Sequence, residues 1–199
     1  MIDESDRGTI REAVREKYDI VARESPQGMF RYENGTEGAR KLGYDQAKLE
    51  RIPDPVLTTF CGVGNPFETG EPGVGDRILD LGCGGGVDSL VAAQAVGPEG
   101  NVVGVDLSPE MIHRARENIG QMSVDNVQLA RATGEELPFH NQRFDIVLSN
   151  GVFNLVPDKT SLFREVFRIL KPGGHLQFAD VVLEEGVEHT SSTPEDWAG

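Results

Sequence analysis

From Gly73 onward, short apolar runs alternate with longer segments in which apolar residues recur every three or four positions. Runs rich in Val, Ile, Leu and Phe, bounded by glycine, proline or polar residues, predict strands, and the segments between them predict helices. The predicted strands are residues 77–81, 101–106, 127–132, 144–149 and 175–183. Strands that alternate with helices favour a parallel sheet with helices on both faces. The predicted fold class is therefore α/β, a doubly wound, mostly parallel sheet of five strands.

Three helices are expected between these strands. The first covers residues 87–96. Ser108 as N-cap and Pro109 at the first helical position predict the second, which runs to about residue 121. The third extends from about residue 160 to 170, and the Lys-Pro-Gly-Gly sequence at 171–174 is expected to end it.

The first 72 residues follow a different pattern. A helix is predicted over residues 9–24, because Ile10, Val14, Tyr18 and Val21 fall on one helical face. Residues 29–72 are rich in glycine and proline, with a short helix expected at 45–52. We interpret residues 1–72 as an N-terminal helical cap on a core of residues 73–185, followed by a polar tail at 186–199. The last strand would then form an open sheet edge. A second copy, the tail or the rest of a longer protein could cover it, and we favour the longer protein.

Composition narrows the range of partners and surroundings. The net charge of −14 argues against nucleic acid and anionic membranes as partners, because both are polyanions. No apolar run approaches the roughly 18 residues of a membrane helix. Two cysteines are too few for a disulfide framework or a structural zinc site, so we expect a cytoplasmic protein without a metal. Only five of the 19 basic residues are lysines, which suits either a protein of a salt-loving organism or an ordinary acidic cytosolic one.

A glycine-rich stretch follows the first predicted strand. Asp80, Gly82, Gly84 and Gly86 precede a helix, whose free N–H groups favour a ligand approaching the bare backbone. The dinucleotide fingerprint needs a third small residue, whereas Val87 stands there. Asp80 would repel a pyrophosphate and suits a ligand with an ammonium and a sulfonium. The stretch therefore favours S-adenosylmethionine, with NAD and an NAD-dependent oxidoreductase as the alternative.

Later segments complete the predicted cofactor site. Asp106 ends the second strand, where a carboxylate can accept hydrogen bonds from ribose hydroxyls, or else merely help to cap the next helix. Residues 133–135 follow the third strand, where the adenine edge would lie. Asn150 ends the fourth strand and would touch the methionine end or the acceptor, or else only cap its loop. The predicted cofactor-binding residues are Tyr18, Asp80, Gly82, Gly84, Gly86, Asp106, Leu107, Met111, Thr133, Gly134, Glu135 and Asn150.

Five motifs in this order resemble the class I S-adenosylmethionine-dependent methyltransferases. They are LDLGCGGG (79–86), VDLSPEM (105–111), ELPF (136–139), FDIV (144–147) and LKPGG (170–174). The resemblance implies a Rossmann-like fold, S-adenosylmethionine as cofactor and Asp106 on its ribose. Further segments look like the arsenite methyltransferases: YDIVA (18–22), ARKLGY (39–44), GNP (64–66), SNGVFNL (149–155) and PEDWAG (194–199).

The chain departs from that closer family at its thiols. Arsenite methyltransferases bind As(III) through cysteines, since a soft ion prefers sulfur. Gly151 stands where one family cysteine lies, residues 25–35 contain none, and a third position would follow Gly199. Cys61 and Cys83 remain. Cys83 lies inside the glycine loop, so at most one thiol is a candidate ligand.

The prediction is an arsenite methyltransferase-like enzyme that transfers a methyl group from S-adenosylmethionine to a small molecule. The alternative in another class is a non-catalytic or truncated S-adenosylmethionine-binding protein. Methyl transfer from a sulfonium mainly requires alignment and exclusion of water, so no catalytic residue is predicted. If a general base is used, the candidates are Asp145, His175 and Asp180. The methyl acceptor and the oligomeric state are left open.

Overall fold

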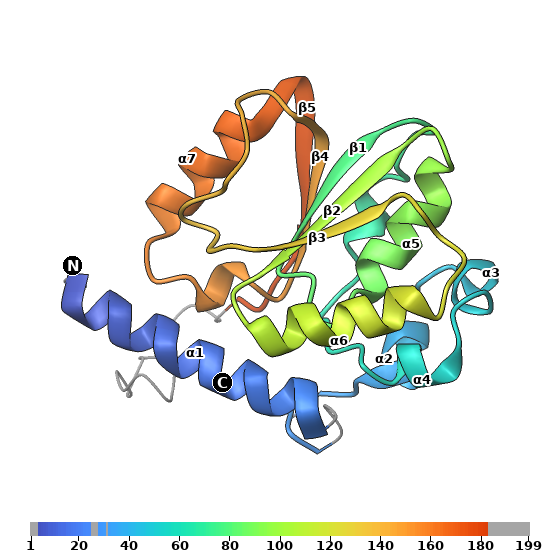
Figure 1. The fold of residues 1–199 in the computed structure, drawn as a ribbon, viewed down its shortest axis with the longest axis horizontal. Coiled ribbons are helices and arrows are strands. Elements are labelled where there is room, and N and C mark those ends of the chain that lie inside the picture. The colour runs from blue at the N-terminus through green and yellow to red at the C-terminus, as the bar shows by residue number, and fades with distance from the viewer. Residues whose placement is uncertain (1–3, 25–27, 31, 183–199) are drawn as a thin grey trace.

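Five parallel strands form one sheet in the computed structural model, which describes residues 4–24, 28–30 and 32–182 (Figure 1). The strands are β1 (Arg77–Leu81), β2 (Asn101–Asp106), β3 (Val127–Arg131), β4 (Phe144–Asn150) and β5 (Leu170–Ala179). Their order in the sheet is β3-β2-β1-β4-β5, and each neighbouring pair is parallel. The predicted doubly wound α/β class is confirmed.

The strand order reverses beside β1. The chain winds from β1 through β2 to β3, then crosses back and adds β4 on the other side of β1. Leu81 at the end of β1 pairs with Val105 on one side and with Ser149 on the other. Open α/β sheets bind ligands outside the carboxyl ends of the strands at such a reversal. The topology therefore places a binding site between the ends of β1 and β4.

Helices cover both faces of the sheet. On one face lie α5 (Val87–Val96) and α6 (Pro109–Gly120), and on the other lies α7 (Lys159–Ile169) (Figure 1). Alternate side chains of β1 point to opposite faces of the sheet, since Ile78 packs in the cluster with α5 and Leu79 packs in the cluster with α7. The three helices expected between the strands are all present.

The N-terminal segment contains one long helix and several short ones. They are α1 (Glu4–Glu24), α2 (Gly35–Lys41), α3 (Gln46–Leu49), α4 (Asp54–Leu57) and the 3-10 turn η1 (Pro66–Thr69). The helix expected at 9–24 is present and starts earlier, while the one expected at 45–52 is limited to α3, where Asp45 caps the amide of Ala47. Tyr44, Phe60 and Phe67 share a hydrophobic cluster with α5. The proposed domain limits stay a prediction.

The boundaries of β5 differ from the prediction. The strand was expected at residues 175–183, but it begins at Leu170 and ends at Ala179; residues 183–199, with the polar tail, lie outside the described part. Leu170 pairs with Phe144, after which the register shifts so that His175 pairs with Ile146. The Lys-Pro-Gly-Gly sequence therefore forms an irregularity inside the strand, with Gly173 at φ +84°, and α7 ends before it at Ile169.

None of the helices in the described part of the chain is both long and apolar enough to cross a membrane.

Candidate functional site

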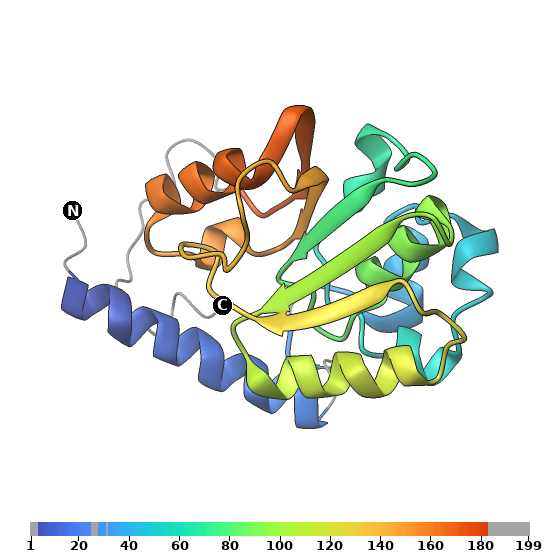
Figure 2. The ribbon, with the colours of Figure 1, turned by 45° about the horizontal axis from the view of Figure 1, so that its top comes forward.

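A cavity of about 840 Å³, counted with its open mouth, lies at the carboxyl ends of β1, β2 and β4. α1 passes below these strand ends and forms one wall (Figure 2). The residues that line it are Arg11, Val14, Arg15, Tyr18, Cys61, Leu81, Gly82, Gly84, Val105, Asp106, Leu107, Ser108, Ala132, Thr133, Gly134, Glu135, Asn150, Gly151, Val152, Leu155, Val156 and Pro157.

The structure brings nine of the twelve predicted site residues into this lining. They are Tyr18, Gly82, Gly84, Asp106, Leu107, Thr133, Gly134, Glu135 and Asn150. They come from α1, from the loop after β1, and from the ends of β2, β3 and β4. The cavity therefore lies at the reversal point, and residues up to 146 positions apart in the chain, Arg11 and Pro157, form its wall.

The other three predicted residues lie outside the lining and make structural contacts. Asp80 points to the α5 face, where it accepts a hydrogen bond of 2.5 Å from the Ser89 hydroxyl. Gly86 is the N-cap of α5. Met111 is buried in a cluster with Val21 of α1. The interpretation of Asp80 as a direct contact of the ammonium is not supported by this geometry.

The loop after β1 is shaped by its glycines. Gly82 has φ +78°, and a Cβ there would lie 2.2 Å from the Cγ2 of Val152. The amide of Gly82 donates to the carbonyl of Val105 at the end of β2. The bare backbone thus passes directly beneath Val152 of the β4 loop, an approach that a side chain at position 82 would prevent.

Asp106 holds the glycine loop and the next helix together. Its Oδ2 accepts from the Gly84 amide and its Oδ1 from the Ser108 amide, both at 2.9 Å. Ser108 is the N-cap of α6 and accepts from the Met111 amide, as predicted. A carboxylate oxygen can accept more than one hydrogen bond, so both oxygens of Asp106 retain the capacity to accept one from a ligand hydroxyl. Burial raises the pKa of Asp106 to about 6.

Three arginines on α1 anchor it beside the cavity. Arg7 bonds Asp158 at 2.6 Å, and Arg11 bonds both oxygens of Glu135 at 2.8 and 3.1 Å. Arg15 bonds Asp19 at 2.6 Å, and Asp19 accepts from the Ser108 hydroxyl. The sequence prediction did not include Arg11 and Arg15 in the site. The recurrence of arginine at every fourth position of α1 places these side chains on one face of the helix and could have indicated them.

Cys61 also lines the cavity and was not among the predicted cofactor-binding residues. It opens the Cys-Gly-Val-Gly-Asn-Pro sequence, whose proximity to the strand ends no local pattern reveals. Burial raises the pKa of its thiol to about 12, so the group is neutral near pH 7. Cys83 is outside the lining, with its Sγ packed 3.0 Å from where a Cβ on Gly104 would lie.

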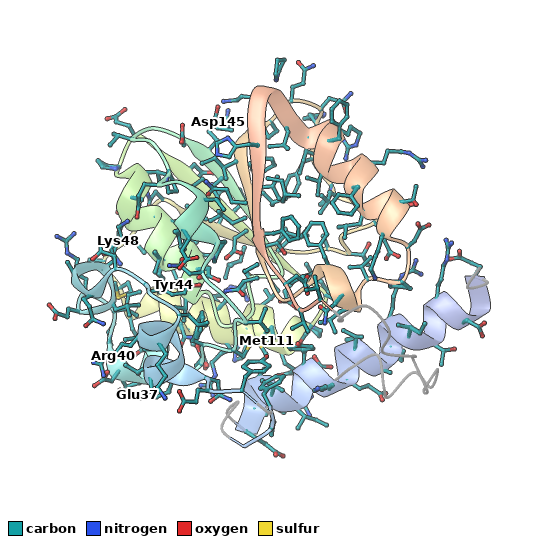
Figure 3. All side chains as sticks on the ribbon, turned by 180° about the vertical axis from the view of Figure 1, so that it is seen from behind. Glu37, Arg40, Tyr44, Lys48, Met111 and Asp145 are labelled. Carbon is teal, nitrogen blue, oxygen red and sulfur yellow. The ribbon has the colours of Figure 1, made fainter. Side chains whose placement is uncertain are left out.

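The three possible general bases do not line the cavity. Asp145 lies near the amino end of β4 and accepts from Lys171 at 2.7 Å, and His175 lies in the middle of β5, paired with Ile146 of β4. Figure 3 shows Asp145 at the end of the sheet remote from α1. Asp180 accepts from the amide of Asn154 at 3.1 Å.

Comparison with known proteins assigns the chain to a family. A family model described as a methyltransferase domain matches residues 73–199. The chain belongs to this methyltransferase family. An arsenite methyltransferase of Halobacterium salinarum is 35% identical over 195 residues, which cover 92% of this chain and 50% of that protein. A demethylmenaquinone methyltransferase of Listeria welshimeri is 39% identical over 106 residues, or 53% of this chain and 45% of that protein.

A solved structure supports the same family assignment. The arsenic(III) S-adenosylmethionine methyltransferase of Chlamydomonas reinhardtii superposes with a TM-score of 0.63 at 36% identity, covering 68% of this chain and 48% of that one. The predicted membership of the S-adenosylmethionine-dependent methyltransferases, with their Rossmann-like fold, is confirmed. The methyltransferase spans about half the length of the curated relatives it matches.

Proposed function

We propose that this methyltransferase binds S-adenosylmethionine in the cavity and transfers its methyl group to a small-molecule acceptor. The observation that carries the proposal is the position of Asp106 and Gly84, hydrogen-bonded to each other in the wall of a cavity at the sheet's reversal point. The cofactor would supply an electrophilic methyl group with a neutral leaving group.

The residues of the cavity fit this group. Asp106 has free acceptor capacity for ribose hydroxyls, and a carboxylate there disfavours a 2′-phosphate. Thr133 and Gly134 line the wall next to the end of β3, where we place the adenine. Val14 and Leu107 offer apolar surface, and the space where a Cβ on Gly84 would lie is open, which lets the ligand approach the backbone there.

Alignment and exclusion of water are what this site supplies to the reaction. Tyr18 of α1 and Cys61 of the cap both line the cavity, so the N-terminal segment closes a space that the sheet alone would leave open. Burial raises the pKa of both the Cys61 thiol and the Tyr18 hydroxyl, which keeps them neutral. No histidine is among the described residues of the lining. These features suit an acceptor that reacts without strong general-base catalysis.

The proposal also includes the chemical class of the methyl acceptor. We infer a soft or electron-rich small molecule, such as a thiol, a quinol-type carbon or trivalent arsenic. Cys61 provides the single thiol among the described residues of the lining. Gly151, at the position of a family cysteine, provides no thiol. One thiol does not form a three-thiolate site for As(III), so this chain by itself is a weaker candidate for arsenite than its relatives. A non-catalytic S-adenosylmethionine-binding protein is the second candidate, favoured by the same shortage of thiols.

Calorimetry and a methyl-transfer assay test the proposal. We expect S-adenosylmethionine and S-adenosylhomocysteine to bind and NAD not to bind. Binding of NAD alone would overturn the assignment of the cavity. Labelled methyl transfer should then be measured with arsenite plus glutathione, beside simple thiols and quinols. Transfer to any of them supports the enzyme, whereas binding without transfer to all of them supports the non-catalytic alternative.

The open edge at β5 and the cytoplasmic location stay predictions. Among the described strands, β5 is the last in the sheet order and pairs only with β4, which leaves its other side as an edge. A homo-oligomer through this edge predicts a mass above that of one chain in light scattering. A strictly monomeric mass would contradict it.

A further inference from the structure

A short loop of the cap, residues 61–64, packs tightly on the carboxyl ends of β4 and β5. A Cβ on Gly62 would lie 2.2 Å from the Nδ2 of Asn150, and one on Gly64 would lie 2.5 Å from the Cβ of Ala179. Cys61, at the start of the loop, lines the cavity. The position of this thiol therefore depends on how the loop is held against the strand ends.

The side chain of Asn150 holds the loop. Its Oδ1 accepts from the amides of Val63 at 2.8 Å and Gly64 at 3.1 Å. Its Nδ2 donates to the carbonyl of Gly64 at 2.9 Å and to the Asp88 carboxylate at 3.1 Å. An asparagine side chain has two donor hydrogens and two acceptor positions. All four are occupied within the protein, so this amide is committed to the loop.

Tyr44 and Asp88 complete the network. The Tyr44 hydroxyl donates to Oδ1 of Asp88 at 2.6 Å and lies 3.0 Å from Nδ2 of Asn150. The Tyr44 ring is 3% exposed and makes edge contacts with Phe60 and Phe67, so its hydroxyl is fixed in place. Figure 3 shows Tyr44 inside the molecule, between the short helices of the cap and the sheet. The three side chains thus join the cap, the first turn of α5 and the end of β4.

We propose that Asn150, supported by Tyr44 and Asp88, is a positioning residue that fixes the 61–64 loop and sets the acceptor side of the cavity through Cys61. The inference rests on the proposed methyl transfer, and it gives Asn150 a role other than contact with the cofactor. Tyr44 and Asp88 are buried and Asn150 is partly buried, so an alternative arrangement that left one of these polar groups without a partner would be costly. The loop and its thiol are therefore held in one position relative to the glycine loop.

Alkylation of Cys61 by iodoacetamide measures this positioning directly. The rate is followed by mass spectrometry on the peptide that contains Cys61, in wild type, Asn150→Ala and Asn126→Ala. Asn126 is the matched control, since its amide also bridges two backbone carbonyls, of Ala93 and Gly97, at the other end of the sheet. We expect Asn150→Ala to raise the rate at least about tenfold, because a released loop exposes the thiol and lowers its pKa. Asn126→Ala should leave the rate within about twofold.

Cofactor binding separates the possible outcomes. We expect Tyr44→Phe, whose side chain is outside the cavity lining, to bind S-adenosylhomocysteine within about threefold of wild type. A tenfold loss of affinity in Asn150→Ala with an unchanged alkylation rate would mean that Asn150 contacts the cofactor, and it would overturn the proposal. An unchanged rate with only a lower melting temperature, as in the control, would show a merely structural role and overturn it too.

Tyr44→Phe keeps the test decisive if Asn150→Ala does not fold. It removes a single hydroxyl from the network and should raise the alkylation rate about threefold. No change in a folded Tyr44→Phe protein would count against the network. Failure of the proposed function shows separately, as an absence of S-adenosylhomocysteine binding by the wild type.

Discussion

At the scale of single residues, Asp106 combines structural hydrogen bonds with a place in the cavity wall, where we propose that it binds the ribose. Both of its oxygens hold backbone amides, of Gly84 and Ser108, and the side chain also lines the cavity. The two interpretations of the sequence, ribose acceptor and helix cap, are therefore compatible in this geometry. Its replacement should affect the cofactor through both tasks.

Asp106→Ala is expected to weaken S-adenosylmethionine binding by about 1–3 kcal/mol, or roughly 5- to 150-fold in Kd, the range of a charge-assisted hydrogen bond. Titration calorimetry measures it. Asp145→Asn is the matched control, because this carboxylate also accepts a backbone amide, that of Arg77, but at the far end of the sheet. Equal affinity of wild type and Asp106→Ala would refute the ribose role.

Buried carboxylates near the cavity predict a pH dependence of stability. Burial raises the pKa of Asp80 to about 8, and of Asp88 and Asp106 to about 6, from an ordinary value near 3.8. Between these values the folded state holds more protons than the unfolded one, so the free energy of unfolding falls as pH rises from about 4 to 8. Melting temperatures in 2 M KCl, where surface repulsion is screened, should decrease over this range.

Asp88→Asn is the variant that checks this assignment. An amide does not titrate, so the decrease between about pH 4 and 6 should become shallower. A slope identical to that of wild type would assign the pH dependence to other groups.

Residue-scale prediction succeeded where a local pattern fixes the side chain. Glycines after a strand and an acid at the end of the next one identify the floor and wall of the cavity. The period of two in a strand also places Asp80 on the same face as Ile78, toward α5, and that signal was overlooked. Asn150 is different, since its partners lie 62 to 106 residues away in the chain. No local pattern encodes such contacts.

At the scale of elements, α1 is fixed over the cavity by its ion pairs. The side chain of Glu135 is 9% exposed, and it binds Arg11 through both oxygens. A partly buried, bidentate ion pair of this kind contributes more to stability than an ordinary surface ion pair does.

We expect Arg11→Met to lower the free energy of unfolding, measured by urea denaturation, by at most about 1 kcal/mol. The exposed pair between Arg40 and Glu37 on α2 offers the control, and Arg40→Met should change it by less than about 0.5 kcal/mol. A double-mutant cycle with Glu135→Gln isolates the pair. A coupling energy of zero would show that the Arg11–Glu135 pair does not contribute to holding α1 in place.

The last strand shows the limits of prediction for elements. Lys-Pro-Gly-Gly resembles a helix end followed by a turn, and α7 does end there. What the sequence does not reveal is that the same residues bulge within β5 while Lys171 reaches Asp145 on β4. A Cβ on Gly174 would lie 2.8 Å from the Asp145 carbonyl. Only the neighbouring strand explains why this glycine is needed.

At the scale of the whole molecule, the parallel sheet and the site at its reversal point follow from alternation of strands and helices. Right-handed crossovers leave few ways to arrange such a chain. The cap was harder to predict, because short helices separated by glycine and proline carry little periodicity. Its packing on α5 depends on Tyr44, Phe60 and Phe67, which meet only in the folded chain.

The charge of the whole chain gives the last prediction. With 33 acidic against 19 basic residues, self-repulsion opposes the compact state at low ionic strength. At 0.1 M salt the screening length is about 10 Å and at 1 M about 3 Å, so repulsion between surface carboxylates largely vanishes. We expect the melting temperature at pH 7 to rise steadily from 0.1 to 2 M KCl, as a salt-adapted protein requires. A melting temperature that stays constant or falls over this range would favour an ordinary acidic cytosolic protein, in which the ion pairs of α1 lost to screening outweigh the repulsion relieved.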